Sequence, residues 1–212
     1  MRNIADIRKE YQLKSLEETD VRENPIDQFQ VWLKEAMDAN SDEPTAMTLA
    51  TSTKDGRPSA RIVLLKKFDQ KGFVFYTNYN SRKANQLNSN PFAALVFFWQ
   101  VLERQVRIEG TIEKVSAEES DEYFLSRPEG SKLGAWASPQ SQKIPDRKYL
   151  ETMVLSFQSQ FGEKVTRRPE YWGGYRLKPF LIEFWQGRSN RLHDRIQYRQ
   201  INGIWKIERL AP

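Results

Sequence analysis

Short apolar segments separated by turn-forming residues recur along most of the chain, and this spacing allows only a few folds. Asn202-Gly203 lies between the last two segments, and this dipeptide is the strongest short signal for a two-residue β-hairpin. The segments expected to form strands are residues 46–53, 59–68, 73–79, 92–99, 104–115, 171–177, 181–186, 191–201 and 204–210. Short strands at this spacing predict a mainly β fold with some α: an antiparallel barrel or sandwich of about six to eight strands, with helices packed outside.

Helical spacing interrupts the strand pattern at four places. Asp27 is expected to cap a helix whose apolar residues repeat at i, i+3, i+4, i+7 and i+8, namely Phe29, Trp32, Leu33, Ala36 and Met37. Ser81 is expected to begin a short helix over residues 82–87. Two longer helices are expected at residues 117–127, ended by Pro128, and at residues 146–161, ended by Gly162.

The first 25 residues are charged and sparsely apolar. We expect them to form an arm, partly helical at residues 4–13, in front of a single domain over residues 26–212. No segment approaches the roughly 20 apolar residues that a membrane span needs. The first 13 residues lack the apolar core of a signal peptide, so the expected location is the cytoplasm.

The chain has no cysteine and one histidine, His193, and this excludes several kinds of chemistry. Disulfides, thiolate zinc sites, iron–sulfur clusters and a cysteine nucleophile all need cysteine. A three-histidine metal site is also excluded, and we predict no metal. The 33 lysines and arginines exceed the 28 acidic residues by a net charge of +5, which suits small anions as well as nucleic acid.

Two groups of cations are candidates for an anion site. Arg82 and Lys83 lie in the first turn of an expected helix, where the helix dipole disfavours cations unless an anion binds there. A solvated surface turn is the simpler alternative. Arg61 and Lys66 bracket an apolar strand, and residues five apart face opposite sides. One ligand would therefore meet both only through a bulge, a strand end or a second subunit; otherwise they are edge charges.

Three further groups are polar and close in sequence. Alternation in an extended segment would place Arg191, His193 and Arg195 on one face, which would attract phosphate or an electron-rich ring and favour neutral imidazole. Tyr123 and Arg127 are four apart on an expected helix, and Ser131 follows a turn, so together they could hold a phosphate. Gln140 and Ser141 lie in a loop that could reach a ligand. Ordinary structural or surface roles remain the alternative for each group.

Familiar catalytic motifs are absent from the sequence. It has no G-x-G-x-x-G, G-x-x-x-x-G-K-[ST], G-x-S-x-G or H-E-x-x-H motif. A hydrolytic triad is disfavoured because only His193 could act as its base. From these residues alone, the chain is an anion-binding β-barrel of undefined purpose.

Nearly the whole chain, from residue 8 to residue 212, resembles the pyridoxamine/pyridoxine 5′-phosphate oxidase family. The resemblance rests on segments that occur in the family's order: RIVLLK (61–66), FYTNYNSRKANQL (75–87), ERQVRIEG (103–110), residues 123–131, WASPQS (136–141), IEFWQG (182–187), RLHDR (191–195) and the terminal WKIERLAP. It implies an FMN-binding split β-barrel with peripheral helices. It also implies a homodimer with FMN sites at the subunit interface.

The resemblance also implies the site residues. The implied FMN contacts are Arg61, Ile62, Val63, Leu64, Leu65, Lys66, Tyr76, Thr77, Arg82, Lys83, Gln105, Gln140, Ser141, Trp185 and Arg195. The implied substrate contacts are Lys66, Tyr123, Arg127, Ser131, Arg191, Leu192 and His193, with Arg8, Lys9, Glu10 and Tyr11 of the arm closing over the site. Arg191 and His193 are the implied catalytic residues.

The implied activity is oxidation of pyridoxine 5′-phosphate or pyridoxamine 5′-phosphate to pyridoxal 5′-phosphate, a step of vitamin B6 salvage and pyridoxal phosphate biosynthesis. A hydride leaves the 4′ carbon of the substrate for FMN. Dioxygen reoxidises the flavin and yields hydrogen peroxide, and the amine substrate also releases ammonia. The expected partners are a second copy of the chain, the phosphorylated pyridine and dioxygen, without nucleic acid or membrane.

Two alternatives remain at this stage. A related split-barrel flavin reductase acting on another substrate would need the Arg61, Arg82 and Lys83 site but not the five residues Tyr123, Arg127, Ser131, Arg191 and His193 together. A nucleic-acid-binding module is suggested by the basic pI near 9.3. The excess charge is spread along the chain, however, and no nucleic-acid-binding motif occurs.

Overall fold

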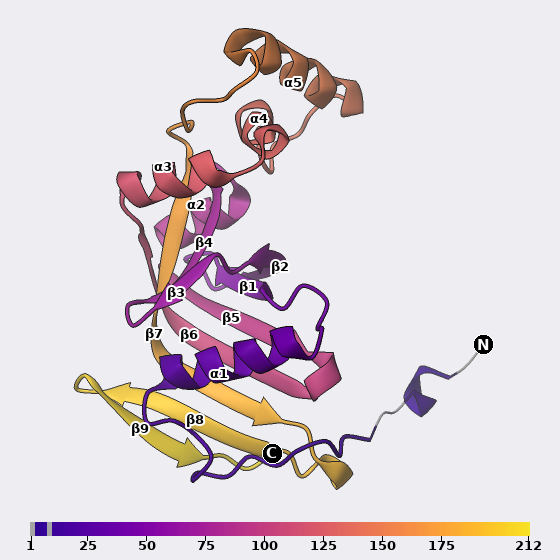
Figure 1. The fold of residues 1–212 in the computed structure, drawn as a ribbon, viewed down its shortest axis with the longest axis vertical. Helices are drawn as coiled ribbons and strands as arrows, with labels where there is room; N and C mark the ends of the chain where they lie inside the picture. Colours follow the sequence, from indigo (N-terminus) through magenta and orange to yellow (C-terminus); the bar gives the residue numbers. More distant parts are fainter. Residues whose placement is uncertain (1–2, 8–9) are drawn as a thin grey trace.

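An antiparallel sheet that curls on itself dominates the molecule (Figure 1). The computed structural model describes residues 3–7 and 10–212. Within them, the strands are β1 (Ala46–Ser52), β2 (Pro58–Leu64), β3 (Lys67–Asp69), β4 (Gly72–Asn78), β5 (Phe92–Trp99), β6 (Arg104–Lys114), β7 (Trp172–Gln186), β8 (Asp194–Ile201) and β9 (Ile204–Arg209). They pair in the order β2-β1-β5-β6-β7-β4-β3, with β8 beside β7 and β9 beside β8. The expected mainly β fold is confirmed.

The helices lie at the periphery of this sheet. In the described residues they are α1 (Pro25–Asp38), α2 (Arg82–Ser89), α3 (Ala117–Ser126), α4 (Glu129–Ala137) and α5 (Arg147–Phe161), with 3₁₀ turns η1 (Ile4–Asp6), η2 (Gln100–Leu102) and η3 (Ser189–Arg191). α3, α4 and α5 gather at one end of the long axis, and β8 and β9 lie at the other end (Figure 1). The molecule therefore has a helical end and a hairpin end.

β7 spans the sheet and explains its shape. One edge of β7 pairs with β6, while the other edge pairs first with β4 and then with β8. Between β2 and β3, the Lys66 N–H donates to the Val74 carbonyl of β4 at 2.9 Å, which brings the two ends of the curled sheet together. The first half of β7 thus belongs to the barrel, and its second half carries the C-terminal hairpin.

The core lies between α1 and the concave face of the sheet. Phe29 of α1 is fully buried and contacts four aromatic rings at centroid distances of 4.9 to 6.1 Å, those of Phe68, Phe73, Phe97 and Trp99. The α1 residues Trp32, Leu33 and Ala36 are buried as the helical spacing predicted, whereas Met37 is 49% exposed. This aromatic packing fixes the sheet on which the candidate site residues stand.

Several strand predictions were wrong in their boundaries. Residues 59–68 form two strands, because the segment changes its pairing partner from β1 to β4. The Leu65 N–H still donates to the Thr45 carbonyl before β1, whereas the Lys66 N–H donates to the Val74 carbonyl of β4. Residues 171–177 and 181–186 form the single strand β7, in spite of Pro179. The register shifts beside Gly110, opposite Pro179, and such a bulge tolerates a residue without an N–H.

The helix predictions need three corrections. Asn24, not Asp27, caps α1 by accepting the Ile26 N–H. Only η1 is helical in the described part of residues 4–13. α4 was not predicted, because Pro128 was interpreted only as the end of a helix. Pro128 ends α3 because a proline keeps the residue before it, here Arg127, in an extended conformation. Pro128 is itself the N-cap residue of α4.

Other local predictions are confirmed. Ser81 caps α2 through the Ala84 N–H, and α5 runs from Arg147 to Phe161 with Gly162 after it. Asn202 and Gly203 both have positive φ, 49° and 81°, as the tight hairpin between β8 and β9 requires.

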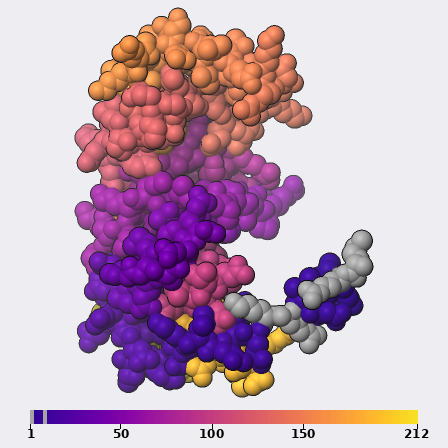
Figure 2. Space-filling model, turned by 45° about the vertical axis from the view of Figure 1, so that its right-hand side comes forward, coloured from indigo at the N-terminus to yellow at the C-terminus, as the bar shows by residue number. Residues whose placement is uncertain are grey.

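The arm lies along the hairpin end of the molecule. Leu16 is only 4% exposed and belongs to the core, whereas the segment that contains η1 stands away from the body (Figure 2). The predicted substrate residues Arg8 and Lys9 lie outside the described residues. The division into an arm (1–25) and a single domain (26–212) stays a prediction.

Candidate cofactor and substrate site

Three cations, Arg61, Arg82 and Lys83, form what we call the cation cluster. The guanidinium of Arg61 on β2 donates to Leu49 O at 3.1 Å and Thr51 Oγ1 at 2.6 Å, both on β1, and to Gln86 Oε1 of α2 at 3.5 Å. Lys83 of α2 donates to Thr77 Oγ1 at 3.1 Å and to Gln140 Oε1 at 2.9 Å. In the described chain no carboxylate forms an ion pair with any of the three, although 18 ion pairs occur elsewhere. The cluster therefore has uncompensated positive charge.

The electrostatics of the cluster support an anion site. Burial, and then the charge of Arg82, lowers the pKa of Arg61. Burial, and then the charge of Arg61, lowers the pKa of Lys83. An anion bound here would offset both effects, because opposite charge favours the ionised forms. Arg82 also lines a surface pocket together with Ser141 and Gln142, so the cluster is open to a ligand.

A second group, which we call the aromatic stack, joins β4, α3 and β7. Tyr76 and Tyr123 stack with ring centroids 4.0 Å apart, and Trp172 lies 5.5 Å from Tyr76 in a nearly parallel plane. The guanidinium of Arg127 lies over Trp172 at 4.7 Å. Its Nη1 is buried without a hydrogen-bond partner, and its pKa is lowered by burial. A half-buried guanidinium with one buried N–H group unpaired is suited to bind an anionic ligand.

The tyrosine hydroxyls of the stack stay protonated at neutral pH and can donate hydrogen bonds. Burial raises the pKa of Tyr76 to about 12, and burial also raises the pKa of Tyr123. Ser131 and Lys66 are exposed, Ser131 on α4 and Lys66 between β2 and β3. The chain by itself does not tie these two side chains to Arg127.

A third group, which we call the His193 cluster, lies at the hairpin end and contains Tyr11, Trp185, Arg191 and His193. The imidazole ring lies 4.6 Å from the Trp185 ring, and Tyr11 meets both rings edge-on at 5.8 and 6.1 Å. Together with Arg191, Tyr11 and His193 line a cavity.

The hydrogen bonding of His193 defines its tautomer. Its Nδ1 accepts the Arg188 N–H at 3.0 Å, so a neutral imidazole carries its proton on Nε2. Burial, and then the charge of Arg191, lowers the pKa of His193, while Asp194 acts in the opposite direction. His193 can therefore donate a hydrogen bond through Nε2 at neutral pH.

The expected extended segment over residues 191–195 is not found. Arg191 belongs to η3 with a φ of 61°, and β8 begins only at Asp194. Simple alternation therefore does not bring Arg191 and His193 together; a turn does. Asn190 also has positive φ, at 55°, and no glycine signalled this left-handed turn in the sequence.

Gln105, Trp185 and Arg195 are neighbours across three adjacent strands. Trp185 of β7 stands opposite Gln105 of β6 and opposite Arg195 of β8. Arg195 also makes a bidentate ion pair with the buried Glu183, at 2.9 and 3.1 Å. This row lies on the face of the sheet that points away from the core.

The structure does not bring the predicted site residues into one place. The cation cluster and the aromatic stack belong to β2, β4, α2 and α3, toward the helical end, whereas the His193 cluster lies beside β8 at the hairpin end (Figure 1). A single chain therefore carries two half-sites at different ends. The sequence reasoning missed Thr51, Gln86, Trp172 and Arg188, because nothing in their local sequence marks them.

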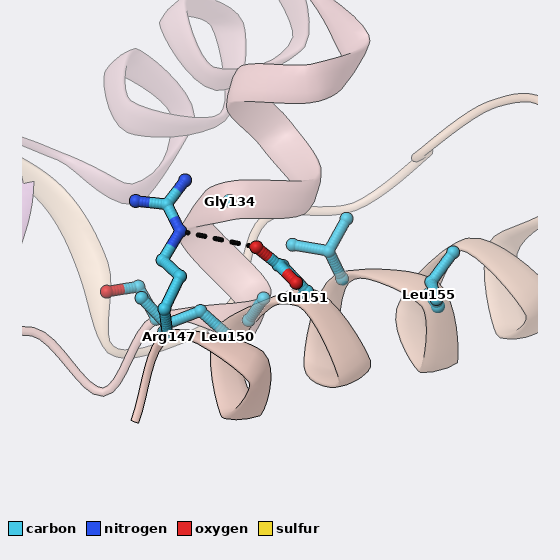
Figure 3. Close-up of a pocket in the computed structure, with 8 residues that line it drawn as sticks. Gly134, Arg147, Leu150, Glu151 and Leu155 are labelled. Carbon is cyan, nitrogen blue, oxygen red and sulfur yellow. Dashed lines mark ion pairs between the residues drawn. The ribbon is translucent and has the colours of Figure 1, made fainter. Parts of the chain in front are cut away.

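A groove between α4 and α5 is a separate feature (Figure 3). Its lining is mostly apolar, including Ala137, Leu150, Val154 and Leu155, and the Arg147–Glu151 ion pair of 3.5 Å lies on its α5 side. No predicted site residue lines it. Among residues 3–7 and 10–212, no cluster of possible metal ligands and no helix able to span a membrane is found.

The curled antiparallel sheet with helices at its periphery defines a split-barrel protein. The fold is that of the Burkholderia lata protein PhzG, solved in complex with tetrahydrophenazine-1-carboxylic acid, with a TM-score of 0.89 and 32% identity over 95% of this chain and all of that one. A pyridoxamine 5′-phosphate oxidase-related, FMN-binding protein from Nostoc punctiforme shares the fold, with a TM-score of 0.71 and 18% identity over 87% of this chain and 97% of that one.

Residues 33–161 match the pyridoxamine 5′-phosphate oxidase family model, and residues 172–212 match the C-terminal dimerisation region of pyridoxine 5′-phosphate oxidase. Pyridoxine/pyridoxamine 5′-phosphate oxidases from Cupriavidus metallidurans and Cyanothece sp. are 58% and 56% identical, covering 100% and 99% of both chains. The chain belongs to the pyridoxamine 5′-phosphate oxidase family of enzymes.

Proposed function

We propose that the chain oxidises pyridoxine 5′-phosphate and pyridoxamine 5′-phosphate to pyridoxal 5′-phosphate, with FMN as cofactor and dioxygen as final acceptor. The observation that carries the proposal is a pair of cationic groups that form no ion pair among the described residues: the cation cluster for the FMN phosphate, and the half-buried Arg127, whose Nη1 is unpaired, for the substrate phosphate. The identity to curated oxidases, 55 to 58%, well above the 32% to PhzG, favours the pyridine substrate.

The residues present fit FMN. Arg61, Arg82 and Lys83 supply charge for its phosphate, and Gln140 supplies a neutral donor and acceptor beside them. The row of Gln105, Trp185 and Arg195 presents polar and aromatic groups for the ring system. Bound FMN would accept the hydride from the 4′ carbon of the substrate, and dioxygen would then reoxidise it with release of hydrogen peroxide.

The chain's own task is to hold the substrate ring flat against the flavin. Arg127, with Tyr123, Ser131 and Lys66, would clamp the substrate phosphate away from the reacting carbon, which converts binding energy into orientation. Arg191 and His193 would contact the ring itself. Because Nδ1 of His193 is occupied by the Arg188 N–H, Nε2 donates a hydrogen bond to the substrate rather than removing a proton.

The separation of the half-sites supports a homodimer. Arg127 and His193 would meet only if the helical end of one chain lies against the hairpin end of a second copy. The outer face of the sheet offers apolar surface for this contact, since Ile62 and Phe98 are 65% and 51% exposed. Each dimer would then contain two complete sites, each built from both chains.

Turnover tests the proposal directly. Purified, FMN-loaded protein should consume both phosphorylated substrates and form pyridoxal 5′-phosphate and hydrogen peroxide in equal amounts. A yellow protein that oxidises neither substrate would instead support a split-barrel flavoprotein with another substrate. A colourless protein that gains no flavin and binds nucleic acid would contradict both readings.

FMN and dimerisation should stabilise each other, because each site needs both chains. FMN at about a hundred times its Kd contributes about 2.7 kcal/mol per site. The FMN-loaded dimer should therefore persist to protein concentrations at least about a hundredfold lower than the apoprotein. Sedimentation velocity over a dilution series measures this shift. If the FMN-loaded and FMN-free forms dissociate at the same concentration, or if the monomer is active, the proposal that each site is built from both chains is wrong.

His193→Asn should change the pH dependence of kcat/KM. The lowered pKa of His193 keeps the imidazole neutral down to a pH below 6.5. Protonation at lower pH places a second cation beside Arg191, and Nδ1 can then no longer accept the hydrogen bond from the Arg188 N–H. The acid side of the parent profile should therefore fall as pH drops through this lowered pKa. The asparagine amide of the variant does not titrate, so only the part due to the substrate phosphate, with a pKa of about 6, should remain. Superimposable profiles would exclude a titrating role for His193.

A further inference from the structure

Glu103 occupies a costly position at the corner between η2 and β6. Its backbone is left-handed, with φ 54° and ψ 40°, and the residue is only 3% exposed. A non-glycine residue in this conformation and a buried carboxylate each cost free energy, so the surroundings must stabilise both. The sequence reasoning gave Glu103 no role.

The carboxylate of Glu103 binds the backbone of the arm. Its Oε2 accepts the N–H groups of Gln12 at 2.8 Å and Leu13 at 3.2 Å. Hydrogen bonds from backbone N–H groups to a carboxylate are charge-assisted and therefore stronger than neutral ones. These bonds fix the residues that directly follow Tyr11.

The backbone of Glu103 also binds Gly187, the residue against which Tyr11 packs. Its carbonyl accepts the Gly187 N–H at 2.7 Å. A Cβ placed on Gly187 would lie 2.7 Å from Cγ of Tyr11, so the Tyr11 ring rests directly on this glycine. One residue therefore sets the arm and the turn after β7 relative to each other.

A second carboxylate holds the arm farther along. Asp194, the neighbour of His193, accepts the Leu16 N–H at 3.0 Å, and Arg209 binds both Asp194 Oδ1 and the Leu16 carbonyl at 3.0 Å. The path of the arm from Gln12 to Leu16 is thus fixed by contacts to the hairpin end. Tyr11 directly precedes this fixed stretch.

We propose that Glu103 is a positioning residue, which holds Tyr11 against Trp185 and His193 and so forms one wall of the substrate site. The inference rests on the proposed function, in which the His193 cluster contacts the substrate ring. Glu103 touches neither substrate nor FMN in this assignment. It acts on substrate affinity only through the arm.

The test is a double-mutant cycle with Glu103→Gln and Tyr11→Ala in the FMN-loaded enzyme. Glu103→Gln keeps the side-chain shape and removes the charge, and KM for pyridoxine 5′-phosphate should rise roughly tenfold while kcat changes little. In the Tyr11→Ala background the same change should raise KM by less than about twofold, because the coupled partner is gone. Trypsin should also cleave faster after Lys14 in Glu103→Gln.

The matched control is Glu113→Gln near the other end of β6, where Glu113 pairs with the exposed Lys178 at 3.2 Å. It should leave KM and cleavage unchanged. If Glu103→Gln fails to fold, Leu13→Pro removes one of the two donors from the arm and should raise KM in the same way. Equal effects of Glu103→Gln with and without Tyr11, or no effect on KM, would overturn the proposal. An active parent enzyme in the same assay shows that such a failure concerns Glu103 and not the proposed function.

Discussion

An equal mixture of Arg127→Met and Arg191→Met chains, unfolded and refolded together with FMN, should regain about a quarter of the parent activity. Each variant alone should retain a few per cent of kcat/KM or less, since one loses a phosphate contact and the other misplaces the ring. Random pairing makes half of the dimers mixed. In a mixed dimer one site carries both substitutions and the other carries neither, so about a quarter of all sites are intact.

The substitutions suit this test because they spare the surroundings. Methionine at position 127 keeps apolar contact with Trp172, on which the guanidinium now stacks at 4.7 Å. Arg191 lies in an exposed turn, where methionine preserves length without charge. Flavin absorbance confirms that every sample is loaded. If the mixture is no more active than the mean of the two variants, each site is built from one chain, and the proposed division is wrong.

The sheet was predictable because its information is local. Alternating apolar residues and turn dipeptides mark strands one by one, and Asn202-Gly203 marks its hairpin completely. The continuity of β7 was not predictable, because it depends on a bulge beside Gly110 in a different strand. α4 was missed for a related reason: Pro128 ends one helix and begins another, and local signals describe only the first of these roles.

The candidate site was predictable in its residue types but not in its geometry. The spacing of Arg61 and Lys66 pointed to a strand end or a second subunit, and the structure indeed ends β2 at Leu64. The turn that brings Arg191 toward His193 has no glycine to announce it. Partners such as Glu103 and Trp172 act through tertiary contacts, so their own sequence neighbourhoods carry no signal.

Lys83→Met should weaken FMN binding by about 10- to 100-fold, because it removes one charge-assisted contact to the phosphate. The same variant should unfold at a slightly higher temperature than the parent when both are free of FMN. Burial and the neighbouring Arg61 lower the pKa of Lys83, so its charge is less favourable in the folded chain than in water. Thr77 Oγ1 and Gln140 Oε1 lie 3.0 Å apart and bond each other, so neither is stranded when the ammonium is removed.

These opposite signs separate a ligand site from a structural lysine. A lysine that merely holds Thr77 and Gln140 together would, when replaced, lower both the melting temperature and the FMN affinity. Lys178→Met is the control, because Lys178 is exposed and pairs with Glu113 at 3.2 Å. It should change the melting temperature and the FMN affinity little. Equilibrium dialysis gives the FMN Kd, and thermal unfolding of stripped protein gives the second quantity. Unchanged FMN affinity in Lys83→Met would place the cofactor phosphate elsewhere.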